Sequence, residues 1–74
     1  MDTNMKNVLL GLYAELLVRY DEDKRVEKLE ELDELCGPEY PDWPTELKDK
    51  IVATNLPGAD EAIHSVDMFH SLCV

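Results

Sequence analysis

The feature that most constrains this fold is the spacing of apolar residues in the first twenty positions. Between Asn4 and Tyr20 they recur every three or four residues, which is the period of an α-helix. We therefore predict a helix over 4–20, with Asp2, Thr3 or Asn4 offering a side-chain oxygen as its cap. The apolar stripe of this helix consists of Met5, Val8, Leu9, Leu12, Tyr13, Leu16, Leu17 and Tyr20.

A second helix is predicted over 22–36, where the acidic run 21–23 precedes it and Gly37-Pro38 ends it. The following segment, 37–44, contains three prolines and is expected to be an extended connection. The apolar stripe of the second helix is formed by Val26, Leu29, Leu32 and Cys36.

Two more helices complete the chain. A short one, capped by Asp42 or Thr45, should run to about Asn55 and be followed by the break Leu56-Pro57-Gly58. The last is predicted over 59–73 because its apolar residues keep the helical period. On one side of the third helix lie Trp43, Leu47 and Ile51, and the stripe of the fourth consists of Ala59, Ala62, Ile63, Val66, Phe69 and Cys73.

These segments predict one all-α domain of about four helices over residues 1–74. The first two helices should form an antiparallel hairpin, the third is short, and the C-terminal helix should pack across the pair. The sequence contains no internal repeat and no Gly/Ser-rich linker, so it does not indicate a second domain. A domain this small buries only about 60% of the surface of its unfolded chain, so that a partner or a second copy would add stability.

The 4–20 helix carries more apolar residues than one face can hold. Leu10 and Val18 project outside its main stripe, which widens the apolar arc. We therefore expect this helix to touch several neighbours or a second copy of the chain. An isologous homodimer through it would have Leu10, Leu17 and Tyr13 at the interface.

The acidic residues are concentrated in one part of the chain. The net charge is −10, and residues 27–46 account for −7 of it, with Lys28 as their one basic residue. Five carboxylates fall within an arc of about 100° on the 22–36 helix and extend over roughly 16 Å, and Glu39 and Asp42 are expected to prolong them. We call these five residues the acidic ridge: Asp23, Glu27, Glu30, Glu31 and Glu34.

The acidic ridge has two interpretations. It can stand in for a phosphate backbone and bind a basic, nucleic-acid-handling protein, as DNA mimics do. By composition alone, small size and strong acidity are what we expect of phage or mobile-element inhibitors of host nucleases or CRISPR complexes, and of immunity proteins against nuclease toxins. Alternatively, it is only a solvated, glutamate-rich helix face that keeps the chain soluble. Direct binding of nucleic acid or of an anionic membrane is disfavoured by the same charge.

A different kind of function would use the apolar surface instead. The surplus apolar residues of the 4–20 helix would then capture a partner helix, and the chain would be an adaptor or a dimeric regulator. Trp43 also has two interpretations, because it can anchor an interface or close the end of the helical bundle by filling the core.

Residues suited to catalysis or metal binding do not form a convincing pattern. His64, Asp67, His70 and Cys73 come at intervals of three, but such a set drifts around a helix until its ends face opposite ways. Cys36 and Cys73 lie on apolar stripes, where thiols are usually inert. The sequence contains no glycine-rich phosphate loop and no nucleophile elbow. We therefore expect no enzyme, no cofactor and no metal.

The sequence also bears on where the chain works. Two cysteines without a paired spacing fit a reducing, cytoplasmic setting. The longest apolar stretch, Val8 to Val18, contains Glu15 and falls short of the roughly 20 residues that a membrane span needs. It is also unlike a secretory signal, since no small-residue cleavage site follows it.

Overall fold

The computed structural model describes residues 2–73, with side chains as far as Leu72, and this part of the chain is all-α. It contains no strand, which confirms the predicted fold class. The elements are α1 (Thr3–Arg19), α2 (Glu22–Cys36), the 3₁₀ turn η1 (Gly37–Glu39), α3 (Trp43–Thr54) and α4 (Ala59–Cys73).

The first two helices begin where an aspartate caps them. The carboxylate of Asp2 accepts a hydrogen bond from the backbone N–H of Met5 at 2.8 Å, and that of Asp21 accepts one from Lys24 at 3.0 Å. Each carboxylate satisfies an N–H that has no partner within the helix, and it lies at the positive end of the helix dipole. Of the three caps that the sequence allowed for α1, the chain uses Asp2.

The connection between α2 and α3 is shorter and more ordered than predicted. Residues 37–44 are not all extended: Gly37 turns the chain at φ 54°, and Gly37–Glu39 form a 3₁₀ turn. Helix α3 already begins at Trp43, with Pro44 in its first turn. Proline is tolerated there because the N–H that it lacks would have no partner within the helix.

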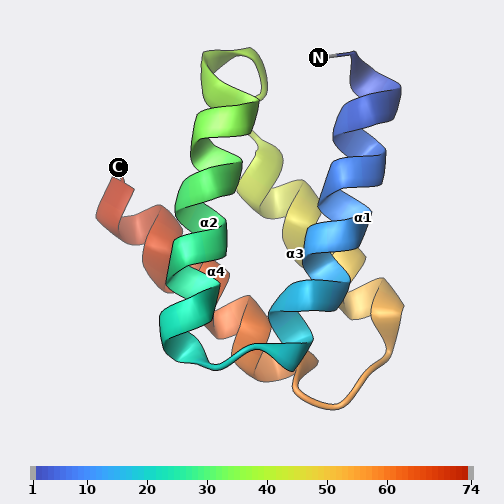
Figure 1. Ribbon diagram of the computed structural model, residues 1–74, viewed down its shortest axis with the longest axis vertical. Helices are drawn as coiled ribbons and strands as arrows, with labels where there is room; N and C mark the ends of the chain where they lie inside the picture. The colour runs from blue at the N-terminus through green and yellow to red at the C-terminus, as the bar shows by residue number, and fades with distance from the viewer. Residues whose placement is uncertain (1, 74) are drawn as a thin grey trace.

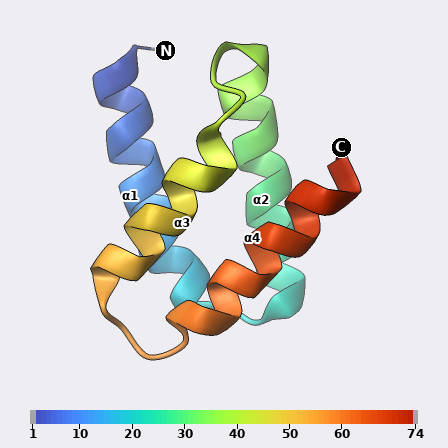
Figure 2. The ribbon, with the colours of Figure 1, turned by 180° about the vertical axis from the view of Figure 1, so that it is seen from behind.

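The helices form two layers (Figures 1 and 2). α1 and α2 run antiparallel on the near side of Figure 1, and α3 and α4 lie behind them. α1 packs most extensively against α3, and α3 against α4, whereas α1 and α2 touch each other less. The predicted hairpin is therefore present but looser than expected, and α4 packs on α3 and α2 more than across α1.

The core lies between the two layers, and Trp43 belongs to it. Only 3% of its surface is exposed, and its ring lies 6.2 Å from that of Phe69 on α4. This confirms that Trp43 fills the bundle, and its prediction as a partner-binding residue is wrong. The buried apolar residues are Leu10, Ala14, Leu17, Val18, Leu29, Leu32, Cys36, Trp43, Leu47, Ile51, Ala62 and Val66.

Helix α1 is rotated relative to the prediction. Leu10 and Leu17 are fully buried in the core of the domain, so they cannot form the predicted dimer interface. Tyr13, the third residue of that interface, is half-buried and packs against the same core. The small side chain of Ala14, also fully buried, suits close packing, and α1 packs most extensively on α3. Much of the predicted stripe consequently faces water.

Lys6 also fixes the orientation of α1. Its Nζ donates hydrogen bonds to both carboxylate oxygens of Glu46 on α3, at 2.8 and 2.9 Å. The same ammonium lies 5.0 Å from the centre of the Tyr40 ring. A buried cation needs such partners, and these hold the N-terminal half of α1 against α3.

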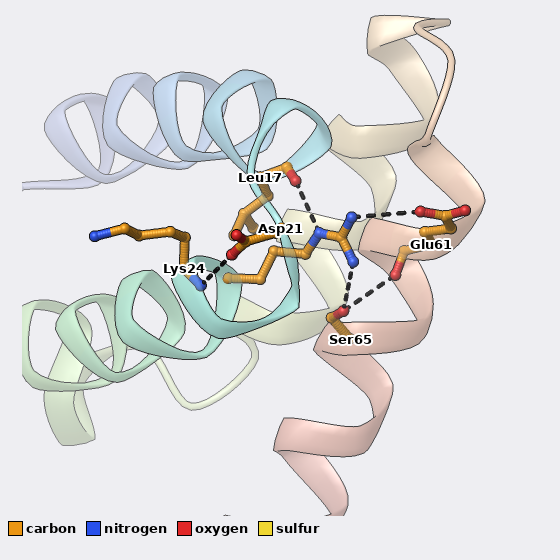
Figure 3. A network of polar contacts seen from close by, with 6 residues as sticks. Leu17, Asp21, Lys24, Glu61 and Ser65 are labelled. Carbon is orange, nitrogen blue, oxygen red and sulfur yellow. Dashed lines mark hydrogen bonds and ion pairs between the residues drawn. The ribbon is translucent and has the colours of Figure 1, made fainter.

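Arg25 plays the corresponding role at the other end of the molecule (Figure 3). Its guanidinium donates to the carbonyl of Leu17 at 3.1 Å, to Oγ of Ser65 at 3.3 Å and to Glu61 at 3.5 Å. It thereby links α2 to both α1 and α4. The sequence predicts Val26 on the buried stripe of α2, but Val26 is 42% exposed and its neighbour Arg25 points inward instead.

The turn between α3 and α4 packs against the end of α1. Gly58 adopts φ 91°, and a Cβ placed there would come within 3.1 Å of the carbonyl oxygen of Val18. Only glycine meets both conditions without strain. The turn therefore fixes where α4 begins relative to α1.

Candidate protein-binding face

The acidic ridge lies on the exposed side of α2. All five of its carboxylates are exposed, as the sequence predicted. Glu27 pairs with Lys24 at 3.4 Å, and Glu31 pairs with Lys28 at 3.0 Å. The other members, Asp23, Glu30 and Glu34, form no ion pair with any described residue.

The ion pairs leave most of the negative field of α2 in place. Two lysines face five acids on this side, and the third basic residue of the helix, Arg25, is turned inward toward Glu61. Exposed pairs such as Lys24–Glu27 are weak and are screened by salt. A basic partner can therefore compete for these glutamates.

The residues predicted to prolong the ridge differ in their placement. Glu39 and Asp42 follow the end of α2 and are exposed, so both are accessible to a partner. Asp42 precedes the first residue of α3 but its side chain caps no N–H there. Trp43, by contrast, is withdrawn into the core and leaves this surface without an aromatic anchor.

An apolar groove opens between α1 and α2. The sequence predicts an apolar surface for a partner on α1, but through Leu10, Leu17 and Tyr13, none of which lines this groove. Its volume is about 700 Å³. Four of its side chains are large and well exposed: Met5 by 62%, Val8 by 65%, Leu12 by 56% and Leu35 by 50%. Soluble monomers rarely leave several such residues together, so this is a candidate binding surface. The groove, as named here, is lined by Asn4, Met5, Val8, Leu9, Leu12 and Leu35.

Helix α2 contributes residues to both the groove and the acidic ridge. Leu35 stands one helical turn after Glu31 and next to Glu34. Burial raises the pKa of Tyr13 on α1, and the negative charge of Glu31 raises it further. The carboxylate of Glu31 thus acts across the space between the helices. Its hydrogen bond with Lys28 raises the pKa of that lysine.

The sequence held a signal for the groove. Met5, Val8 and Leu12 belong to the one apolar stripe that the sequence predicts for α1, but periodicity does not say whether that stripe is buried. Leu35 was not included because it lies off the stripe of α2, and only the packing of the helices brings it beside α1. The pairing of α1 with α3 rather than α2 was not readable from periodicity.

The residues considered for chemistry are scattered. His64 is exposed and His70 is half-buried, and the described side chains contain no group of three His, Cys, Asp or Glu suited to a metal ion. Cys36 is buried, and burial raises the pKa of its thiol, which keeps it protonated and weakly nucleophilic. The side chain of Cys73 lies outside the described residues.

Comparison with protein families, with curated proteins and with solved structures gives no match. Within residues 2–73, none of the helices is long and apolar enough to cross a bilayer. The candidate site therefore rests on its own geometry and charge.

Proposed function

We propose that this domain is a non-enzymatic inhibitor or modulator that binds a basic, nucleic-acid-handling protein through the acidic ridge. The observation that carries the proposal is the exposure of Asp23, Glu30 and Glu34 on one side of α2 without ion-pair partners among the described residues. Carboxylates held on a rigid helix attract a basic groove over a long range and lose little mobility on binding.

The proposal includes the DNA-mimic mode of action. The ridge would occupy the groove in which the partner normally holds a phosphate backbone, and it would block that groove by competition. Inhibitors made by phages and mobile elements against nucleases or CRISPR complexes act on partners of this chemistry. A reducing, cytoplasmic compartment suits the free thiol of Cys36.

The test is capture of binding proteins on the immobilised chain, with mass spectrometry of what is retained. We expect nucleic-acid-binding proteins that are released by an excess of short duplex DNA, because DNA and the ridge compete for one groove. Their association should slow sharply as the salt concentration rises.

A pair of charge-matched variants makes the test specific. Glu30→Lys with Glu34→Lys reverses two ridge carboxylates and should abolish capture. Asp49→Lys with Asp60→Lys makes the same change of total charge at exposed positions on α3 and α4, away from the ridge, and it should leave capture intact. Equal retention by the two variants, with unchanged helicity, would contradict the proposal.

The second candidate function is that of a helical adaptor, and the groove favours it. Four exposed apolar side chains from two helices form a surface of the kind that takes up an amphipathic helix. Binding by such an adaptor would be insensitive to salt and to reversal of the ridge charges. It would be lost on Leu12→Glu.

A further inference from the structure

The dimensions of the groove limit what it can hold. Met5 and Leu12 mark its ends along α1, and at the rise of an α-helix they are about 10 Å apart. A helix laid along the groove would therefore present about two turns to it. Three apolar side chains at spacing i, i+4 and i+7 fill that length.

The charges beside the groove select the edge of the incoming helix. On the α2 side, Glu31 lies one turn before Leu35 and pairs with Lys28 at 3.0 Å, and Glu34 is the residue before Leu35. On the α1 side, Glu15 lies exposed one turn after Leu12. The positive charge of the N-terminal half of α1, Lys6, is turned away toward Glu46. The groove is therefore an apolar strip with more acidic than basic side chains around it, three glutamates against Lys28, which complements an apolar stripe bordered by lysine or arginine.

A second copy of this chain fits the groove less well. Each copy carries a net charge of −10, and a face-to-face pairing of the α1–α2 layers would bring two acidic ridges together. The outward stripe of α1 is bordered by Glu15, and Arg19 is the one exposed basic residue of that helix. A groove about two turns long is also small beside the roughly 800 Å² per partner of a stable interface.

We propose that the groove binds a short amphipathic helix whose apolar stripe is bordered by basic residues, and that this helix belongs to the partner engaged by the acidic ridge. The inference rests on the proposed function and names the element of the partner that is recognised. The groove supplies apolar contact and the ridge selects the charge of the helix edge. In Figure 1 the near side of the α1–α2 layer is uncovered by any other described helix, so the approach is open.

The probe is a labelled helical peptide of about 14 residues, with leucines at i, i+4 and i+7 and lysines along one edge of the leucine stripe. Its twin has glutamates in place of the lysines. We expect fluorescence anisotropy to show binding of the lysine peptide at least about tenfold tighter than that of the twin, with the preference shrinking as salt is raised. No binding, or equal binding of both peptides, overturns the inference.

Two variants of the chain locate the peptide. Leu12→Glu should weaken binding of the lysine peptide at least about tenfold, because Leu12 is one of the well-exposed apolar side chains that line the groove. Met68→Glu is the matched control: Met68 is a similarly exposed apolar residue on α4, outside the groove, and its variant should bind normally. Circular dichroism should be unchanged in both.

The failure of this inference can be told apart from that of the proposed function. Binding that is lost on Glu30→Lys with Glu34→Lys but kept on Leu12→Glu overturns the groove and supports the ridge. If the ridge variant captures the same proteins as the unchanged chain, while Leu12→Glu abolishes binding of the lysine peptide, the proposed function is overturned instead. A dimer in sedimentation that Leu12→Glu dissolves also overturns the inference, because the occupant is then a second copy.

Discussion

The two faces of α1 have nearly the same chemistry and opposite surroundings. The inward face carries Leu10 and Leu17, both fully buried, and the outward face carries Val8 and Leu12, both more than half exposed. Val18 is a third large apolar residue on the inward face and Met5 a third on the outward face, so this count does not distinguish the two faces. The difference shows that helical periodicity marks an apolar face without saying whether the fold or a partner covers it.

The contacts behind the helix explain which face is buried. The inward face of α1 contains Ala14, whose size suits close packing, and Lys6, whose charge finds Glu46 on α3. On the outward face, Leu35 is the residue of α2 that lines the groove together with the exposed apolar residues of α1. Complementary partners, rather than hydrophobicity alone, fixed the rotation of α1.

The largest effect expected from this comparison is on stability. Leu10→Ala should lower the free energy of unfolding by about 2–5 kcal/mol, because it leaves a cavity in the core. Leu12→Ala removes the same atoms from the outward face and should cost no more than about 0.5 kcal/mol. Urea denaturation followed by circular dichroism measures both, and similar losses for the two variants would erase the distinction between the faces.

A smaller effect is expected where the inward face carries charge. Glu46→Gln should destabilise the domain by about 1–2 kcal/mol, because the ammonium of Lys6 remains buried while Glu46 is partly open to water. Lys6→Met removes the buried charge and should restore part of this loss. A double-mutant cycle by urea denaturation measures the coupling, and strictly additive losses would show that the pair does not fix α1.

The third prediction concerns groups between α1 and α2 that lose a proton at high pH: the domain should lose stability as the pH rises. Tyr13 and Lys28 both have raised pKa values in the folded chain, so the unfolded chain gives up its protons first above about pH 10. Cys36 acts in the same direction from about pH 8.5. Urea titrations at increasing pH should show the decline, and Tyr13→Phe should reduce it. A stability that is flat to pH 11 would contradict these shifts.

The smallest effect should come from making the outward face polar. Met5→Gln and Val8→Gln should each change the free energy of unfolding by less than about 0.5 kcal/mol, because both side chains are already in water. Both substitutions should also weaken binding of the lysine peptide. Thermal denaturation and anisotropy together separate the two roles, and a marked loss of stability would mean that these residues serve the fold.

Much of the secondary structure was predictable because its signals are local. The spans 22–36 and 59–73 match α2 and α4, since Asp21 caps one helix and Gly37 and Gly58 set breaks that only glycine tolerates. The 37–44 connection was mispredicted because its prolines exclude a helix interior but are compatible with a 3₁₀ turn and with the first turn of α3.

The candidate site was predictable only in part. The exposed carboxylates of α2 follow from their position opposite Leu29, which depends on one helix alone. The groove depends on Leu35 of α2 lining one space with Val8 and Leu12 of α1, and this depends on how the two helices pack in the bundle. A single sequence carries the first kind of information and little of the second.

The anchoring of Lys6 has a consequence for the energetics of recognition. The first turns of a helix usually fray, yet here Met5 and Val8 sit on a segment pinned from behind by Glu46 and the ring of Tyr40. A peptide that binds the groove would contact side chains that are already ordered, so binding would cost little conformational entropy. Glu46→Gln should therefore weaken peptide binding to the groove although Glu46 does not line it, because α1 is then less well ordered before binding.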